Sequence, residues 1–371
     1  MCLDFGDDDY RERVEEIVRL VASAGVVRHR VVGGRRQRPD PKFYAGRGKI
    51  EEIARAAAEL NAGYVVFNHE MSPAQQRNVE KELSVRTLDR TELILEIFAQ
   101  RAQTNEGKLQ VELARLQHLA TRLVRGWTHL ERQRGGFGAT GGPGETQLEL
   151  DRRYIATKVK TLKGRLAQLQ KQRTVQRRAR SRGDVLSVSI VGYTNAGKST
   201  LFNALANAKA YEADQLFATL DTTTRRIWIP PANPVVLSDT VGFIRDLPHT
   251  LVAAFRATLE ETVHADVLLH VVDASSPARE MQQEEVNKVL AEIGADEIPQ
   301  ILVWNKIDVV RDKSATAGLE PAAERDQYGR ISRVFVSART GAGLNDLRGA
   351  IAEFGAARSA ERNPPKASIS L

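Results

Sequence analysis

The sequence predicts an α/β protein with an N-terminal α/β domain and a long antiparallel helical hairpin, followed by a second α/β domain with a mostly parallel sheet. Strand-like runs alternate with helical runs in residues 1–105 and again in 184–356. Between these regions, residues 106–182 hold two heptad stripes on either side of a glycine-rich segment at 134–145. The second domain also contains a complete glycine-rich loop of the phosphate-binding type.

Length and composition limit the class of protein. The 371 residues are 42% hydrophobic, which fits two or three globular domains. The single cysteine, Cys2, excludes a disulfide within one chain. No stretch approaches the ~20 apolar residues of a membrane span, and the acidic N-terminus is unlike a signal peptide. We therefore expect a cytoplasmic monomer, with a disordered tail at 357–371.

The N-terminal region reads as alternating helices and strands. We expect helices over 10–24 and 50–60, a helix opening at Pro73 with Ser72 as its cap, and strands over 25–32, 62–68 and 85–89. No constellation of catalytic residues is recognisable in this region.

The hairpin is predicted from heptad spacing. Apolar residues follow each other at steps of four and three on both sides of the glycine-rich segment. The first stripe is Leu109, Leu113, Leu116, Ala120 and Leu123, and the second is Ile155, Val159, Leu162, Leu166 and Leu169. Residues 134–145 contain six glycines and a proline, which we expect to end the first helix and form a flexible tip.

Positive charge is concentrated in the second half of the hairpin. Residues 152–182 contain twelve Lys or Arg and no acid, whereas the whole chain has a net charge of +7. A local excess of this kind is typical of contact with a polyanion, and Trp127 and Phe137 could stack on bases. Arg122 and Arg125 flank the tip. The residues expected to contact RNA are Arg132, Arg134, Gly136, Phe137, Gly138, Arg152, Arg153, Lys158, Lys163, Arg177 and Arg178.

Two other interpretations of this segment stay open. The hairpin could be a spacer whose cations form a solvated face. The glycine tip could also be a second phosphate loop, although it lacks the Gly-Lys-Ser ending.

The phosphate loop lies where a strand is expected to meet a helix. A short apolar run at 186–191 precedes the loop, and Thr200 begins a helical pattern. Glycines let backbone N–H groups turn toward phosphate oxygens, Lys198 should reach the β- and γ-phosphates, and Ser199 should ligate Mg²⁺. The residues expected to bind nucleotide here are Gly192, Tyr193, Thr194, Asn195, Ala196, Gly197, Lys198, Ser199 and Thr200.

Three further motifs follow in order, each after a strand-like run. Asp239 can hold Mg²⁺ through a water, and Gly242 leaves room for the γ-phosphate. Asp308 can accept both guanine N1–H and the 2-amino group, a donor pair that adenine lacks, while Asn305 braces the loops. Together the motifs predict binding of GTP and GDP. They comprise Asp239, Thr240, Val241 and Gly242, then Asn305, Lys306, Ile307 and Asp308, and finally Ser337, Ala338 and Arg339.

A mobile threonine is needed between the first two motifs to complete the Mg²⁺ shell. The segment Phe217, Ala218, Thr219, Leu220 and Asp221 supplies one, and we assign the role to Thr219. Four threonines compete, and the threonines at 222–224 could instead begin a strand.

The hydrolysis machinery looks incomplete. Many GTPases carry a glutamine after the Asp-x-x-Gly motif, whereas this chain has Phe243, which cannot hold water by a hydrogen bond. We expect slow intrinsic hydrolysis with stimulation by a partner. Lys198, Thr219, Gly242 and Asn195 are the candidate catalytic residues, and Asn195 could seat K⁺ or simply cap its own loop. A solvated role is expected for Arg225, Arg226 and Arg245.

The chain closely resembles the HflX family of translation-factor-related GTPases. The resemblance rests on residues 72–78, 89–91, 125–131 and 142–149, and on the nucleotide motifs at 192–200, 217–221 and 239–244. The family usually shows Asp-Pro-Thr where this chain has Asp221-Thr222-Thr223. The resemblance implies a GTPase that binds the large ribosomal subunit and dissociates stalled or heat-stressed ribosomes, with the hairpin reaching toward the peptidyl-transferase region.

Two alternative functions use the same features. An RNA chaperone or helicase-like factor would need an ATP site in residues 1–105, where we see no phosphate loop. A GTPase that assembles the large subunit would use the same basic surface as a rescue factor, so the sequence does not separate the two.

Overall fold

The computed structural model describes residues 1–6, 9–125, 143–181, 185–207, 216–230, 234–255, 259–313 and 320–362. The chain divides into two compact units. Unit 1 comprises residues 1–167 together with 248–254, and unit 2 comprises residues 168–247 and 255–371.

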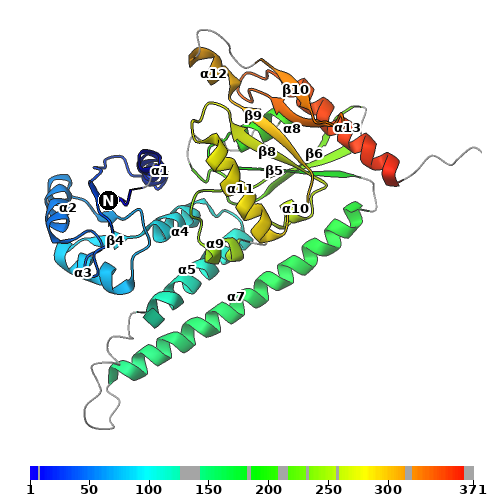
Figure 1. Cartoon of the computed structure of the whole chain (residues 1–371). Helices are drawn as coiled ribbons and strands as arrows, with labels where there is room; N and C mark the ends of the chain where they lie inside the picture. The colour runs from blue at the N-terminus through cyan, green and yellow to red at the C-terminus, as the bar shows by residue number, and fades with distance from the viewer. Residues whose placement is uncertain are drawn as a thin grey trace, which may run out of the picture. The chain divides into compact units, whose positions relative to one another are not determined.

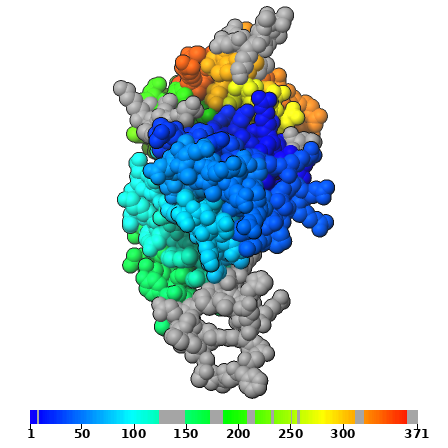
Figure 2. All heavy atoms as spheres, turned by 90° about the vertical axis from the view of Figure 1, so that its left-hand side faces the viewer, coloured from blue at the N-terminus to red at the C-terminus, as the bar shows by residue number. Residues whose placement is uncertain are grey.

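The first part of unit 1 is a small α/β assembly. Strand β1 (Cys2–Asp4) pairs in parallel with β2 (Gly33–Arg35), and β3 (Tyr64–Val66) pairs in parallel with β4 (Arg86–Leu88). The Met1 amino group donates to the Val66 carbonyl at 2.6 Å, which joins the two strand pairs. Helices α1 (Tyr10–Ser23), α2 (Arg47–Leu60), α3 (Pro73–Leu83) and α4 (Arg90–Arg101) complete this part, whose surface is the blue and cyan region of Figure 2.

Most of the predicted elements in this region are present, but the strand expected at 25–32 is wrong. Residues 26–32 form no ladder with the described residues, and β2 begins only at Gly33. Cys2 pairs with Gly33 and Asp4 with Arg35, so the ladder with β1 starts at Gly33, and of the residues before it Val32 accepts one hydrogen bond, from the Cys2 N–H at 3.1 Å. High β-propensity gives a strand only where a neighbouring strand supplies hydrogen bonds. Strand β1 itself was not predicted.

The hairpin is formed by α5 (Asn105–Arg125) and α7 (Pro143–Ser181), which run side by side in opposite directions in Figure 1. Leu113, Leu162 and Leu166 form a buried cluster, with Leu109, Leu116 and Val159 packed against it. These residues belong to the two predicted stripes. Pro143 begins α7, so the glycine-rich tip ends before residue 143 and not at 145; proline fits the first turn of a helix because its missing N–H has no partner there.

A buried polar network joins the hairpin to the α/β part of unit 1. Arg122 on α5 donates to Asp89 Oδ2 at 2.9 Å and to Gln76 Oε1 at 2.5 Å, and its Nε lies 3.4 Å from Glu92 Oε1. Burial raises the pKa of Asp89, while the Arg122 guanidinium acts in the opposite direction. Arg122, which the sequence analysis placed among the cations that flank the tip, is 12% exposed and paired with these acids.

The same network explains part of the family resemblance. Ser72 and Asp89 each cap a helix through a reciprocal capping box, with Gln75 and Glu92 respectively. Gln76 also donates to the Thr87 carbonyl at 2.6 Å. Residues 72–78 and 89–91 thus hold helices α3, α4 and α5 together.

Unit 2 is built on a sheet of order β10-β11-β9-β8-β5-β7-β6 in the described residues. Its five central strands are parallel, and the edge strands β10 and β6 are antiparallel. The strands are β5 (Leu186–Gly192), β6 (Thr223–Trp228), β7 (Pro234–Asp239), β8 (Val267–Asp273), β9 (Gln300–Asn305), β10 (Ala322–Arg325) and β11 (Ile331–Phe335). The prediction of a mostly parallel sheet is confirmed.

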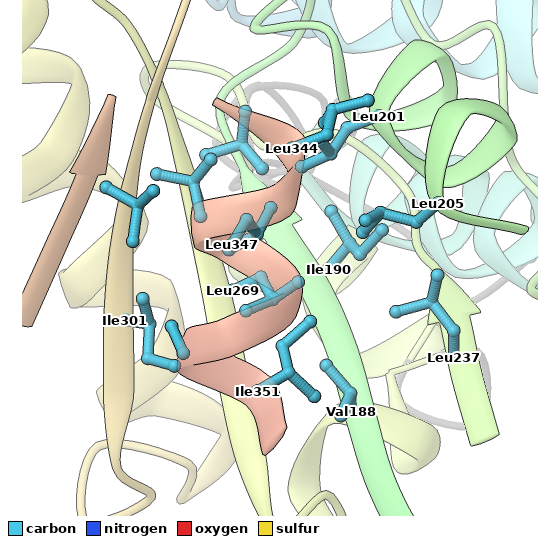
Figure 3. Close-up of a cluster of buried hydrophobic side chains, with 14 of the residues drawn as sticks. Val188, Ile190, Leu201, Leu205, Leu237, Leu269, Ile301, Leu344, Leu347 and Ile351 are labelled. Atoms are coloured by element: carbon cyan, nitrogen blue, oxygen red, sulfur yellow. The ribbon is translucent and has the colours of Figure 1, made fainter. Parts of the chain in front are cut away.

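Helices cover both faces of this sheet. Figure 3 shows leucine and isoleucine side chains of α8 (Lys198–Ala206) and α13 (Leu344–Arg362) facing the central strands, and Figure 1 places α11 (Arg279–Ile293) over the other face. Short helices α9 (His249–Ala254), α10 (Glu260–Val263) and α12 (Ile307–Lys313) complete the fold. Because α13 continues to Arg362, the disordered tail expected from 357 is wrong for 357–362; residues 363–371 lie outside the described residues.

Among the described residues, no helix is long and apolar enough to cross a membrane. Cys2, the single cysteine, is a buried free thiol.

The Arg122 network gives a stability prediction. Replacing Arg122 by methionine removes the cation and leaves Asp89, which is fully buried, without its partner. We expect a loss of about 3 kcal/mol in the free energy of opening of α4 and α5, because an uncompensated buried charge is costly. Amide hydrogen exchange measures that free energy helix by helix.

A matched control is Arg153→Met, which breaks an ion pair to Glu149 whose side chains are 74% and 63% exposed. We expect about 0.3 kcal/mol there. Equal effects of the two substitutions would show that the Arg122 network does not hold the hairpin.

Candidate nucleotide site

The phosphate loop connects β5 to α8 and is shaped by two glycines. Gly192 has φ of 149° and pairs with Val271 of β8, where a Cβ would collide with the Val271 carbonyl. Gly197 has φ of 92°, and a Cβ there would collide with the side-chain amide of Asn305. Only glycine fits both positions. The helix that follows begins at Lys198, so its N-terminus points at this loop.

Asn305 bridges two loops at the end of β9. Its Nδ2 donates to the Ala196 carbonyl at 2.9 Å, and its Oδ1 accepts from the Ala338 N–H at 2.9 Å. The side chain is buried, with 2% of its surface exposed. Asn305 therefore fixes the phosphate loop against the segment that follows β11.

Three oxygen-bearing side chains meet beside the loop. Ser199 Oγ and Thr219 Oγ1 donate to Asp239 Oδ2 at 2.7 and 3.0 Å, and the two hydroxyls lie 2.8 Å apart. Asp239 Oδ1 is buried and has no hydrogen-bond partner among the described residues. Burial raises the pKa of Asp239, and the hydrogen bond from Ser199 opposes the shift. A hard cation such as Mg²⁺ favours this oxygen set, so the residues fit the metal.

The other threonines of the switch segment lie elsewhere. Thr223 and Thr224 belong to β6 and pair with Asp239 and Ser238 of β7. Thr219 is thus the threonine of the 219–224 segment whose hydroxyl contacts both Ser199 and Asp239.

Lys198 lies at the bottom of a pocket of about 50 Å³ that the phosphate loop, Thr219 and Gly242 line. Its Nζ donates to the Tyr193 carbonyl at 2.8 Å. Burial lowers the pKa of Lys198 to about 8, and the nearby Asp239 carboxylate partly opposes this shift. A buried ammonium that has one carbonyl partner is suited to receive a phosphate anion.

The loop after Asp239 is bonded to the phosphate loop through its backbone. Phe243 donates to the Gly192 carbonyl at 3.2 Å and accepts from the Thr194 N–H at 2.7 Å. A Cβ on Gly242 would lie 2.8 Å from Thr194 Cγ2 and 2.9 Å from Lys198 Nζ. The close approach of the two loops therefore requires glycine at 242.

Sequence reasoning did not reveal the contact between Tyr193 and Arg245. The Tyr193 hydroxyl accepts from the Arg245 N–H at 2.8 Å, so Tyr193 anchors the second loop as well as receiving Lys198. The solvated role expected for Arg245 is wrong, because the residue is buried with 6% of its surface exposed. Arg225 and Arg226 are exposed on β6, as expected.

The base-recognition motif follows β9 directly. Asp308 is half-buried in the first turn of α12, and Ser337, at the end of the β11 strand region, is fully buried. Lys306 has φ of 67°, and its Nζ lies 2.8 Å from Asp273 Oδ2. Asp273 is a partner that the sequence motif did not reveal; it ends β8 beside β9, where Asp273 pairs with Asn305.

The residues expected to contact RNA are only partly described. Arg132, Arg134, Gly136, Phe137 and Gly138 lie outside the described residues, and the side chains of Arg177 and Arg178 on α7 are likewise not described. Of the others, Arg152, Arg153 and Lys163 are exposed on α7, and Lys158 is partly exposed.

Three family descriptions match the chain along its length. Residues 11–99 match "GTP-binding GTPase N-terminal", 101–180 match "GTP-binding GTPase Middle Region" and 187–306 match "50S ribosome-binding GTPase". Together these regions cover most of both units.

Similar proteins agree with these matches. "GTPase HflX" of Escherichia coli (strain K12) is 54% identical over 94% of this chain and 80% of its own length. "GTPase HflX" of Magnetococcus marinus is 48% identical over 92% of this chain and 77% of its own length. The crystal structure of SsGBP with GDP covers 94% of this chain and 97% of its own, at 25% identity and a TM-score of 0.50. The chain therefore binds and hydrolyses GTP, and it belongs to the HflX family of GTPases.

Proposed function

We propose that this GTPase binds the large ribosomal subunit through its hairpin and dissociates stalled or stressed ribosomes. The proposal rests on one observation above all, the exposed cations of α7. Arg152, Lys160 and Lys163 are exposed on this helix, while Ile155, Leu162 and Leu166 are buried. One side of α7 thus builds the hairpin, and the rest presents positive charge, which ribosomal RNA neutralises.

The short helix α9 would transmit a conformational change from the nucleotide site to the hairpin. Residues 248–254 follow the Asp-x-x-Gly motif by six positions and group with unit 1. Helix α9 packs on α5, and its Leu251, Val252 and Ala254 are buried. A shift of Gly242 toward a γ-phosphate would therefore be transmitted along a short stretch of chain to the first helix of the hairpin.

Mg²⁺ belongs to this proposal. Ser199 and Thr219 would ligate the ion, and Asp239 would hold it through a water. The ion supplies charge neutralisation on the phosphates when it is bound. The residues of the chain supply the other contacts. Lys198 binds phosphate oxygens, and the hydrogen bond between the Thr219 hydroxyl and Asp239 forms or breaks with the nucleotide state.

The first prediction concerns base recognition. In Asp308→Asn the amide offers one acceptor and one donor in place of two acceptor oxygens, which suits a xanthine base and not guanine. We expect GDP affinity to fall roughly 100-fold, as expected for hydrogen bonds to a charged group, and affinity for xanthosine diphosphate to rise. Calorimetric titration of both nucleotides measures the change. Asp296→Asn, at an exposed position, is the matched control; unchanged GDP affinity in Asp308→Asn would remove Asp308 from the base site.

The second prediction concerns K⁺. Asn195 has φ of 61° and lines the phosphate pocket, which supports a role for its side-chain oxygen in seating a monovalent cation beside the phosphates. We expect hydrolysis to be roughly 10- to 100-fold faster in K⁺ than in Na⁺, the range for one electrostatic stabiliser. Asn195→Gly removes the side chain without strain at positive φ and should lose the difference.

Asn195→Asp restores an oxygen and should keep the preference for K⁺. A preference that survives in Asn195→Gly would show that Asn195 only shapes the loop.

The third prediction tests the proposal as a whole. GTP hydrolysis is measured with and without purified large subunits, and ribosome dissociation is followed by sedimentation in the presence of GTP. We expect at least about 10-fold stimulation, since Phe243 supplies no water-orienting group. The variant Arg152→Gln/Lys160→Gln/Lys163→Gln should lose most of the stimulation.

The control variant Arg28→Gln/Lys81→Gln/Arg330→Gln removes three exposed cations elsewhere and should behave as the unaltered chain. Equal hydrolysis with and without ribosomes would overturn the proposal. Stimulation by free large subunits without dissociation of whole ribosomes would favour the role in large-subunit assembly.

A further inference from the structure

Helix α7 carries an exposed apolar and aromatic strip beside its cations. Leu150 and Tyr154 are both large, and they are 61% and 60% exposed. Lys158 and Arg165 continue the strip at helical spacing. Ile155, Leu162 and Leu166 of the same helix are buried against α5, so the strip lies off the hairpin contact.

Tyr154 and Lys158 are placed together. The Lys158 Nζ lies 4.8 Å from the centre of the Tyr154 ring. This contact orients the ring on the helix surface, and the exposed fraction leaves ring area open for a further planar partner. A tyrosine ring whose orientation is fixed and whose face is exposed can stack on a planar group such as a nucleobase.

The charges around Tyr154 favour RNA over a protein partner. Toward the carboxyl end, residues 152–182 carry no acid, and Lys158, Lys163 and Arg165 lie within three turns of the ring. On the amino-terminal side, the Glu149 carboxylate is paired with Arg153, while Asp151 is exposed. Phosphates would therefore follow the Lys158–Arg165 side, because the exposed Asp151 carboxylate repels them on the other side.

We propose that Tyr154 is a stacking platform for one unpaired nucleobase of the large-subunit RNA, with Lys158 binding the neighbouring phosphate and Arg165 a phosphate further along the same strand. This inference rests on the proposed function and assigns it a specific contact. Residues four apart on a helix are about 6 Å apart along its axis, which is similar to the length of one nucleotide step in an extended strand. Aromatic stacking on a base contributes about 1–3 kcal/mol and is tolerant of sequence.

The test distinguishes stacking from electrostatic contacts by the salt dependence of the binding constant. Binding of the full chain, loaded with a non-hydrolysable GTP analogue, to purified large subunits is measured from low to high salt. Tyr154→Ala should weaken binding about 10-fold at every salt concentration and leave the slope of log K against log salt unchanged. Lys158→Gln should lower that slope by about 1. Tyr154→Phe should bind as the unaltered chain.

Tyr328→Ala is the matched control, because Tyr328 is 77% exposed in unit 2. Ultraviolet crosslinking of the complex, mapped by mass spectrometry, should join the peptide containing Tyr154 to RNA. Full affinity in Tyr154→Ala, or a crosslink from this peptide to a ribosomal protein, would overturn the inference while leaving the proposed function intact. Failure of the unaltered chain to bind large subunits would overturn both.

Discussion

The nucleotide site depends on the common direction of five strands. Strands β5, β7, β8, β9 and β11 are parallel neighbours, so their carboxyl ends meet at one edge of the sheet. The ends of β5, β7, β9 and β11 are each followed by one motif, and segments more than 100 residues apart in sequence become hydrogen-bonded partners, as Asn305 and Ala196 are. A reversed central strand would carry its motif to the opposite edge, and no substitution of side chains could compensate.

Within this frame, backbone contacts set the spacing of the loops. Phe243 exchanges two hydrogen bonds with the phosphate loop, and Gly242 lies too close to Thr194 for any side chain. The loop that senses the γ-phosphate is therefore part of the same hydrogen-bonded assembly as the loop that binds it. The Arg245 N–H is likewise bonded to the Tyr193 hydroxyl, and α9 begins a few residues later in the chain.

The sequence predicted what depends on local chemistry and missed what depends on partners. The phosphate loop, the Ser72 cap and the two leucine stripes of the hairpin are defined by short-range spacing, so they could be found from the residues alone. The strand at 25–32 could not be excluded, because its valines favour a strand wherever a neighbour exists. Arg245 was misassigned and the partners of Arg122 were missed for a related reason: a cation's partners lie far along the chain, and only the fold brings Asp89 to Arg122. Thr219 was chosen among four threonines from the sequence, and the structure adds that Thr223 and Thr224 enter β6.

Phe243 affects both the packing of the fold and the site of hydrolysis. Its ring is fully buried, and its backbone joins the two loops, so the residue anchors the switch where other GTPases place a polar side chain. Replacing it by glutamine would put a polar amide into an apolar site and would cost stability without bringing the amide to the phosphates. The buried Phe243 ring therefore offers no polar group to an attacking water. On the proposed function, groups from outside this position, a cation near Asn195 or a group supplied by the ribosome, would provide the missing stabilisation, and hydrolysis would depend on the bound partner.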